Sequence, residues 1–176
     1  ITYILRTVTM KQKNIDLQDS LRKKGSLLIK ENKLDQALDI FLKLEKETPK
    51  CPNTLFTIGE LFFKKDDYEN TNNYLSNLLS NFKIKFPPHG YFILATSLRI
   101  LGKNQDAENI LKSLCKSNPN SADYFNQRII NLTYLKEWNK SLFLVQQAIK
   151  QFPNDNRFLP LKNYIDFFQQ EKNTVT

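Results

Sequence analysis

The chain has 176 residues, of which 40% are apolar and 12% aromatic, and its formal net charge is +8. This composition excludes wholesale disorder. Only 4 glycines and few β-branched clusters argue against a β sandwich, so helix is the expected structure. No stretch approaches the roughly 18 uncharged apolar residues that a transmembrane helix needs. The positive charge is scattered among acidic residues, so it forms no basic stripe.

A pattern with a period of 34 residues organises most of the chain. Pro119 and Pro153 are 34 residues apart, and the same spacing separates Leu111 from Val145. A third copy of the same pattern ends at Pro49. A fixed period of this length is typical of a helical repeat array.

Residues 1–17 do not continue the period upstream. We interpret them as a leader, either a loose helix or an extended arm, and the opening on Ile1 suggests a fragment boundary. Three apolar residues of this leader are expected to pack on the first repeat: Ile4, Leu5 and Val8.

Repeat one spans residues 18–51 and predicts two helices. In the first, Gly25 lies on the apolar face between Leu21 and Leu28, where it would let a neighbouring helix approach closely. In the second, Ala37, Phe41 and Leu44 share a face, and Pro49 is expected to end the helix.

Repeat two, 52–87, departs from the pattern at its end. Lys83 stands where proline is expected, and two extra residues precede the next repeat. The Pro87–Pro88 pair supplies a later stop.

Repeats three and four span 88–121 and 122–155. Repeat three fits the pattern throughout, whereas in repeat four Ile129 replaces a small residue. We therefore expect the two helices of repeat four to lie further apart or at a changed angle.

Residues 158–170 predict a capping helix, with Leu161, Tyr164, Ile165 and Phe168 on its inner stripe. Phe158 and Phe167 fall off that stripe, so they either help to cover repeat four or form a surface for self-association or partner docking. The repeat domain thus spans residues 18–171, and 172–176 form a frayed tail.

This arrangement resembles the tetratricopeptide repeat family, whose pattern is a 34-residue helix-turn-helix. The pattern has a small eighth residue, Ala at the twentieth position and Pro at the thirty-second. The eighth position here is Gly25, Gly59, Ala95 and Ile129, and the thirty-second is Pro49, Lys83, Pro119 and Pro153. The resemblance implies an all-α, right-handed α-solenoid of four repeats with a C-terminal capping helix.

The resemblance also implies a concave groove lined by the first helix of each repeat. Its exposed positions are the second, fifth, ninth, twelfth and thirteenth, which in repeat three include Thr96 and Ile100. Large apolar groups at such positions favour pockets for the anchors of a bound segment. The predicted partner groove comprises Arg22, Phe56, Glu60, Phe63, Lys64, Phe92, Arg99, Ile130 and Tyr134. The implied function is that of a protein–protein interaction scaffold or adaptor that binds a peptide or helix of another protein.

Catalytic and metal chemistry lack the residues that they need. His89 is the single histidine, and no glycines are grouped into a phosphate-binding loop. We therefore predict no catalytic site, cofactor or metal, and no enzyme activity. Cys51 and Cys115 match no metal or redox spacing, which favours a reducing, cytoplasmic environment.

Two other functions stay open. RNA binding fits the positive charge, but the ninth position does not repeat one polar residue type as RNA-reading arrays tend to do. A secretion-type chaperone is the other alternative, although such chaperones are usually acidic. The family's clamp for the acidic tails of heat-shock chaperones is incomplete, because Ser26, Thr57, His89 and Ile93 replace its donors.

Overall fold

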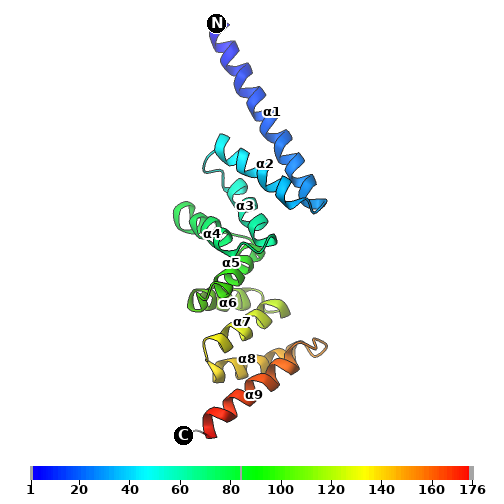
Figure 1. The fold of residues 1–176 in the computed structure, drawn as a ribbon, viewed down its shortest axis with the longest axis vertical. Helices are drawn as coiled ribbons and strands as arrows, with labels where there is room; N and C mark the ends of the chain where they lie inside the picture. Colours follow the sequence, from blue (N-terminus) through cyan, green and yellow to red (C-terminus); the bar gives the residue numbers. More distant parts are fainter. Residues whose placement is uncertain (1, 84, 175–176) are drawn as a thin grey trace. The chain divides into compact units, whose positions relative to one another are not determined.

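The computed structural model describes the backbone of residues 2–83 and 85–174, and the side chains of residues 12, 15–83 and 85–170. Over these residues the chain forms nine helices and no strand (Figure 1). Their bounds are α1 Thr2–Lys30, α2 Leu34–Glu47, α3 Pro52–Lys64, α4 Tyr68–Phe82, α5 Pro88–Ile100, α6 Asn104–Ser117, α7 Ala122–Tyr134, α8 Trp138–Gln151 and α9 Phe158–Thr174. The predicted all-α helical-repeat class is confirmed. The chain divides into two compact units, unit 1 (Ile1–Lys85) and unit 2 (Phe86–Thr176).

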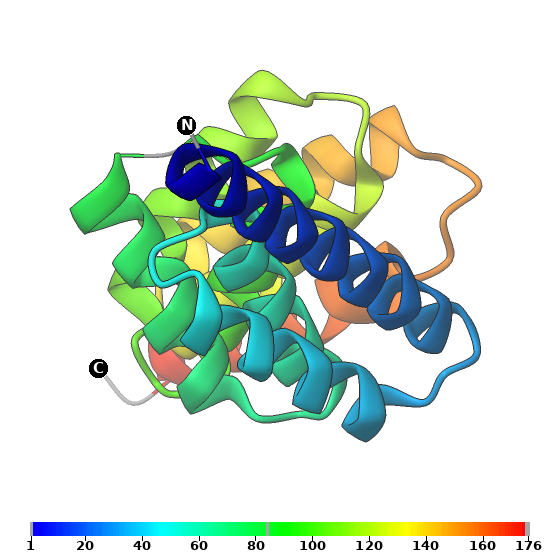
Figure 2. The same cartoon turned by 90° about the horizontal axis from the view of Figure 1, so that it is seen from above.

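Unit 1 is built by sequential packing of α1 on α2, α2 on α3, and α3 on α4. The helices α1 and α2 lie alongside each other in both views, and the start of α1 runs beyond α2 (Figures 1 and 2). The predicted leader, from residue 2 onward, is helical and continuous with the first helix of repeat one. The side chains of Ile4, Leu5 and Val8 lie outside those that the structure describes.

Glycine at the eighth position allows close helix packing in unit 1, as predicted. A Cβ added to Gly25 would lie 2.6 Å from Cε2 of Phe41, and one added to Gly59 would lie 2.8 Å from Cδ2 of Leu75. Both distances are shorter than van der Waals contact. The two helices of each pair can therefore lie this close only because glycine has no side chain.

Every repeat turns from its first helix into its second through a left-handed residue at the fifteenth position. The φ angles there are 58° at Asn32, 59° at Asp66, 76° at Gly102 and 57° at Lys136. Asn, Asp and Gly tolerate this conformation, whereas a lysine in it is sterically strained. The turn is therefore a feature of the backbone that only three of the four sequences favour.

Proline at the thirty-second position ends the second helix of a repeat two residues earlier. The residue between helix and proline leaves the helical conformation at Thr48, Asn118 and Phe152, with φ between −124° and −132° and ψ between 64° and 74°. The proline ring disfavours the helical conformation for the residue before it. Without that proline, α4 continues to Phe82, and Lys83 ends it in the left-handed region with φ 51°.

The core of unit 2 accommodates the large residue at the eighth position of repeat four. Ile129 is fully buried, and the Ser141 hydroxyl donates a hydrogen bond to its carbonyl oxygen at 3.2 Å. A small residue at the twentieth position thus faces the large one at the eighth. The expected change in helix separation stays a prediction.

The last helix of unit 2 decides between the two predictions for Phe158 and corrects the one for Tyr164. Phe158 is fully buried in the unit 2 core and packs against Phe152 at 5.9 Å, so it helps to cover repeat four and is not a self-association surface. Tyr164 was expected on the inner stripe but is 49% exposed, while Ile165 is fully buried. The cause is the packing of α9 against both α8 and α7, which makes Phe158 and Ile165 the inner residues.

Candidate functional site

In unit 2, the first helices of repeats three and four contact each other and form one face. The ring centroids of Phe92 on α5 and Tyr124 on α7 are 5.4 Å apart. At the other end of the same helices, the Arg99 guanidinium carbon lies 5.8 Å from the centre of the Tyr134 ring. Two predicted groove residues are thus joined by a cation–π contact across the helix pair.

Large apolar side chains of this face stay exposed to solvent. Tyr134 is 62% exposed and Ile100 is 44% exposed. Ile130, one turn before Tyr134 on α7, is half-buried. Aromatic and aliphatic groups that remain in water at helix positions which could have been polar are typical of binding surfaces.

The prediction that Thr96 is exposed is wrong. Thr96 is only 9% exposed, because α5 packs against both α6 and α7. Its hydroxyl oxygen and the Nε of Arg99 are buried and have no hydrogen-bond partner among the described residues.

In unit 1, the predicted groove residues lie on α1 and α3. Phe56, Glu60 and Phe63 are half-buried, and Lys64 is exposed. The ring of Phe63 meets the edge of Tyr68 at 5.9 Å, which holds it against the turn into α4.

Arg22 is held by its neighbours within unit 1. Its Nη1 donates to the Asp19 carboxylate at 3.2 Å, and its Nη2 donates to the Cys51 sulfur at 3.9 Å. Arg22 therefore links α1 to the residue that precedes α3. Its guanidinium already has an acidic partner, so its charge is partly neutralised.

Sequence reasoning missed Tyr124 as part of the unit 2 face. It occupies the third position of repeat four, which the family resemblance does not assign to the groove. The available signal was its separation from Phe92: the two aromatics stand near equivalent places one repeat apart, where stacked first helices bring them together.

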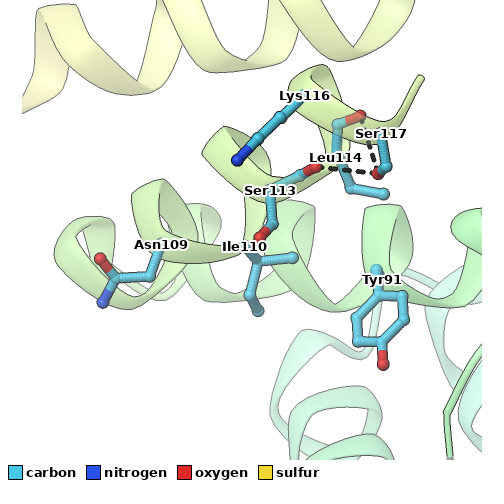
Figure 3. Close-up of a pocket in the computed structure, with 7 residues that line it drawn as sticks. All are labelled: Tyr91, Asn109, Ile110, Ser113, Leu114, Lys116 and Ser117. Atoms are coloured by element: carbon cyan, nitrogen blue, oxygen red, sulfur yellow. Dashed lines mark hydrogen bonds between the residues drawn. The ribbon is translucent and has the colours of Figure 1, made fainter. Parts of the chain in front are cut away.

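An open surface pocket of about 660 Å³ lies elsewhere in unit 2, lined by one residue of α5 and six of α6 (Figure 3). None of the nine predicted groove residues lines it. Its apolar part comes from Tyr91, Ile110 and Leu114, and the Ser117 hydroxyl donates to backbone oxygens of α6 at its rim. The full lining is Tyr91, Asn109, Ile110, Ser113, Leu114, Lys116 and Ser117.

The two cysteines have opposite environments. Burial acts to raise the pKa of the Cys51 thiol, but hydrogen bonds with Thr54 and the charge of Arg22 outweigh it, so the pKa is lowered. Burial raises the pKa of the Cys115 thiol to about 11, against the opposing charge of Arg128. We therefore expect Cys51 to be the more reactive thiol.

Among the residues that the structure describes, no three His, Cys, Asp or Glu side chains come together in a way that could hold a metal ion. Within the same part of the chain, no helix is both long and apolar enough to cross a membrane.

Comparison with known proteins finds similar folds but no similar sequence family. No family model matches the chain, and no curated protein matches it. Among solved structures, MamA 41-end from Desulfovibrio magneticus RS-1 is similar with a TM-score of 0.78 and 13% identity, over 89% of this chain and 88% of that one. Another MamA crystal structure gives a TM-score of 0.73 and 16% identity, over 83% of this chain and 84% of that one.

YrrB, described as a TPR protein with an unusual peptide-binding site, is similar with a TM-score of 0.78 and 16% identity, over 92% of this chain and 83% of YrrB. At such low identity the likeness concerns the fold alone. Together with the helix pairs, the left-handed turns and the glycine-mediated packing, it establishes that this chain has the fold of a tetratricopeptide repeat protein.

Proposed function

We propose that the protein is a non-enzymatic adaptor that binds a peptide or helix of another protein on the first helices of its repeats. The observation that carries the proposal is the exposed pair Tyr134 and Ile100, at 62% and 44%, on the unit 2 face. Apolar anchors of a partner would gain most by covering such side chains. YrrB, which has a similar fold and a peptide-binding site, supports the proposal by analogy.

Arg99 would orient the bound segment. The Tyr134 ring holds its guanidinium at 5.8 Å, and its Nε lacks a hydrogen-bond partner among the described residues. Because Nε is buried, a carboxylate of the partner would form its charge-assisted hydrogen bond with the terminal nitrogens of the guanidinium, whose side chain is partly exposed. Phe92 and Ile130 would add apolar contact on either side.

The predicted groove residues of unit 1 would form a contact surface of their own. Phe56 and Phe63 would offer apolar surface, Lys64 is exposed and basic, and Arg22 and Glu60 would select the charge of the approaching segment. Because Arg22 is already paired with Asp19, we expect it to contribute less than Arg99 does.

Affinity capture with mass spectrometry tests the proposal. The Ile100→Ala/Tyr134→Ala protein should lose a captured partner by about tenfold or more, since the two residues would be central anchors. The matched control is Phe143→Ala, which removes a side chain that is 63% exposed on α8. Far-ultraviolet circular dichroism should be unchanged in both. Equal capture by the double variant, or equal loss in the control, would overturn the proposal.

RNA binding is the alternative that the same protein sample can address. Several basic residues are paired with carboxylates, such as Arg128 with Glu108 and Arg157 with Asp123, which lowers the charge available to phosphates. We expect little RNA affinity at physiological salt, measured by fluorescence anisotropy across a salt titration. Tight binding at that salt, with a steep salt dependence, would favour the alternative.

The cellular setting that fits the cysteines is a reducing one, such as the cytoplasm. Cys51 and Cys115 are both unpaired in the structure. Alkylation of the protein immediately on cell lysis should modify both thiols once it is denatured. A protein that resists alkylation until it is reduced would exclude this setting.

A further inference from the structure

The outward side of α9 is apolar and has no cover among the described residues of unit 2. Leu159 is 58% exposed, Tyr164 49% and Phe167 57%. At 100° per residue these three positions fall within an arc of about 140° on the helix. The three side chains therefore form one stripe rather than scattered exposure, which is the arrangement that association surfaces use.

The rest of unit 2 holds this stripe in place from behind. The ring of Phe168 lies 4.7 Å from that of Tyr164 and 5.3 Å from that of Phe167. Phe168 in turn stacks on Trp138 at 5.6 Å, with the ring planes 7° apart. Because Phe158 and Ile165 are fully buried on the opposite side, α9 cannot turn its outward residues inward without emptying the core.

The described side chains of the stripe carry no charge. Pro160, Asn163 and Gln170 are the other described residues on the arc, all of them exposed and uncharged, and Glu171, which the spacing also puts on the arc, lies outside the described side chains. At its edge, Lys162 and Asp166 form an ion pair at 2.5 Å and neutralise each other. On a chain of net charge +8, this is a place where two identical molecules can approach without facing like charges.

We propose that the outward stripe of α9 binds the same stripe of a second copy of this chain, as a two-fold antiparallel helix pair centred on Asn163. Leu159 and Phe167 are equidistant from Asn163, so an antiparallel pair about that residue places each Leu159 on the other copy's Phe167. The two Asn163 side chains then meet on the axis, where an amide can both donate and accept a hydrogen bond. A closed two-fold contact of this kind uses the same patch twice.

The dimer is weak by its size. A helix of 17 residues is about 25 Å long, and one helix pair buries less than the roughly 1,200 Å² of a standard stable interface. Its population therefore depends on protein concentration.

Sedimentation velocity over a range of concentrations tests the contact. The wild-type protein should shift from monomer to dimer as its concentration rises, and Phe167→Asp should raise the dissociation constant by about tenfold or more. Phe143→Asp is the matched control, because Phe143 is an exposed aromatic on α8 and should leave the shift unchanged. A wild-type protein that stays monomeric at all concentrations, or a control that loses the dimer equally, would overturn the proposal.

A cross-link tests the register without disturbing the apolar stripe. In a Cys51→Ser background, Asn163→Cys should form an intermolecular disulfide under mild oxidation, because the two copies of that position meet on the axis. Gln170→Cys, two turns away, should not form one, and Cys115 is buried. Equal cross-linking at both positions would exclude this register.

The contact is independent of the proposed partner site. The Ile100→Ala/Tyr134→Ala protein should dimerise like the wild type, and Phe167→Asp should capture a partner as the wild type does. The two proposals can therefore fail separately.

Discussion

Units 1 and 2 join consecutive repeats at the same two positions with different chemistry. The twenty-first position of one repeat and the seventh of the next are Leu38 and Ile58 in unit 1, both buried in one apolar cluster. In unit 2 the equivalent residues are Glu108 and Arg128, whose charged groups are 2.8 Å apart. Their side chains are only 12% and 18% exposed, so the ion pair lies mostly within the protein.

The comparison shows that the repeat register does not depend on one kind of contact. An apolar pair needs only complementary volume, while a buried ion pair must recover the free energy of dehydration through its geometry. At Glu108 the dehydration of the carboxylate is compensated only in part, because its Oε2 is buried without a hydrogen-bond partner among the described residues. The apolar junction should thus tolerate more change than the charged one.

Breaking the charged junction should have the largest effect. Arg128→Met leaves the Glu108 carboxylate buried without its partner, which should lower the free energy of unfolding by about 3 kcal/mol. The double variant Glu108→Leu/Arg128→Ile copies the unit 1 residues and should recover most of that loss. Urea denaturation measures both; a double variant as unstable as the single one would show that the two junctions are not equivalent.

Filling the glycine position of unit 1 should come next. Gly25→Leu drives a side chain into Phe41, and overpacking of about 3 kcal/mol is partly offset by about 1 kcal/mol of better helix propensity. We expect a net loss of about 2 kcal/mol in urea denaturation. Ser26→Leu, at the exposed next residue, is the control and should change stability by less than about 0.5 kcal/mol.

The left-handed turns allow a smaller and opposite change. Lys136→Gly in unit 2 removes the steric strain of a lysine in the left-handed conformation and should raise the free energy of unfolding by about 1 kcal/mol. Gly102→Ala should lower it by a similar amount, because Gly102 has φ 76°. Thermal denaturation measures both; a loss on Lys136→Gly would contradict the steric account.

The two thiols should differ in rate without any change in stability. At pH 8, a thiol reagent should modify Cys51 of unit 1 quickly, because its pKa is lowered, and should leave Cys115 of unit 2 unmodified until the chain unfolds. Arg22→Ala should slow the reaction of Cys51, since Arg22 stabilises the thiolate. Faster reaction of Cys115 in the native protein would be inconsistent with its burial.

The helices and their ends were predictable because short-range rules set them. Pro49, Pro119 and Pro153 end their helices through a clash with the residue before them. Gly25 and Gly59 marked close packing for an equally local reason, the absence of a Cβ. Of the candidate site, the positions of Arg99 and Tyr134 were predicted, but their contact and the role of Tyr124 were not.

The amino-acid sequence by itself determined the repeat: its period, its helix ends and the apolar stripe of each helix, since each follows from residues a few positions apart. Tertiary packing decided which side chains are left for binding. Thr96 and Tyr164 differ from the sequence expectation, and the sequence left two alternatives open for Phe158, because exposure depends on the neighbouring helix. A residue off the stripe of its own helix is buried or exposed according to whether α7 or α8 covers it, and no local rule contains that information.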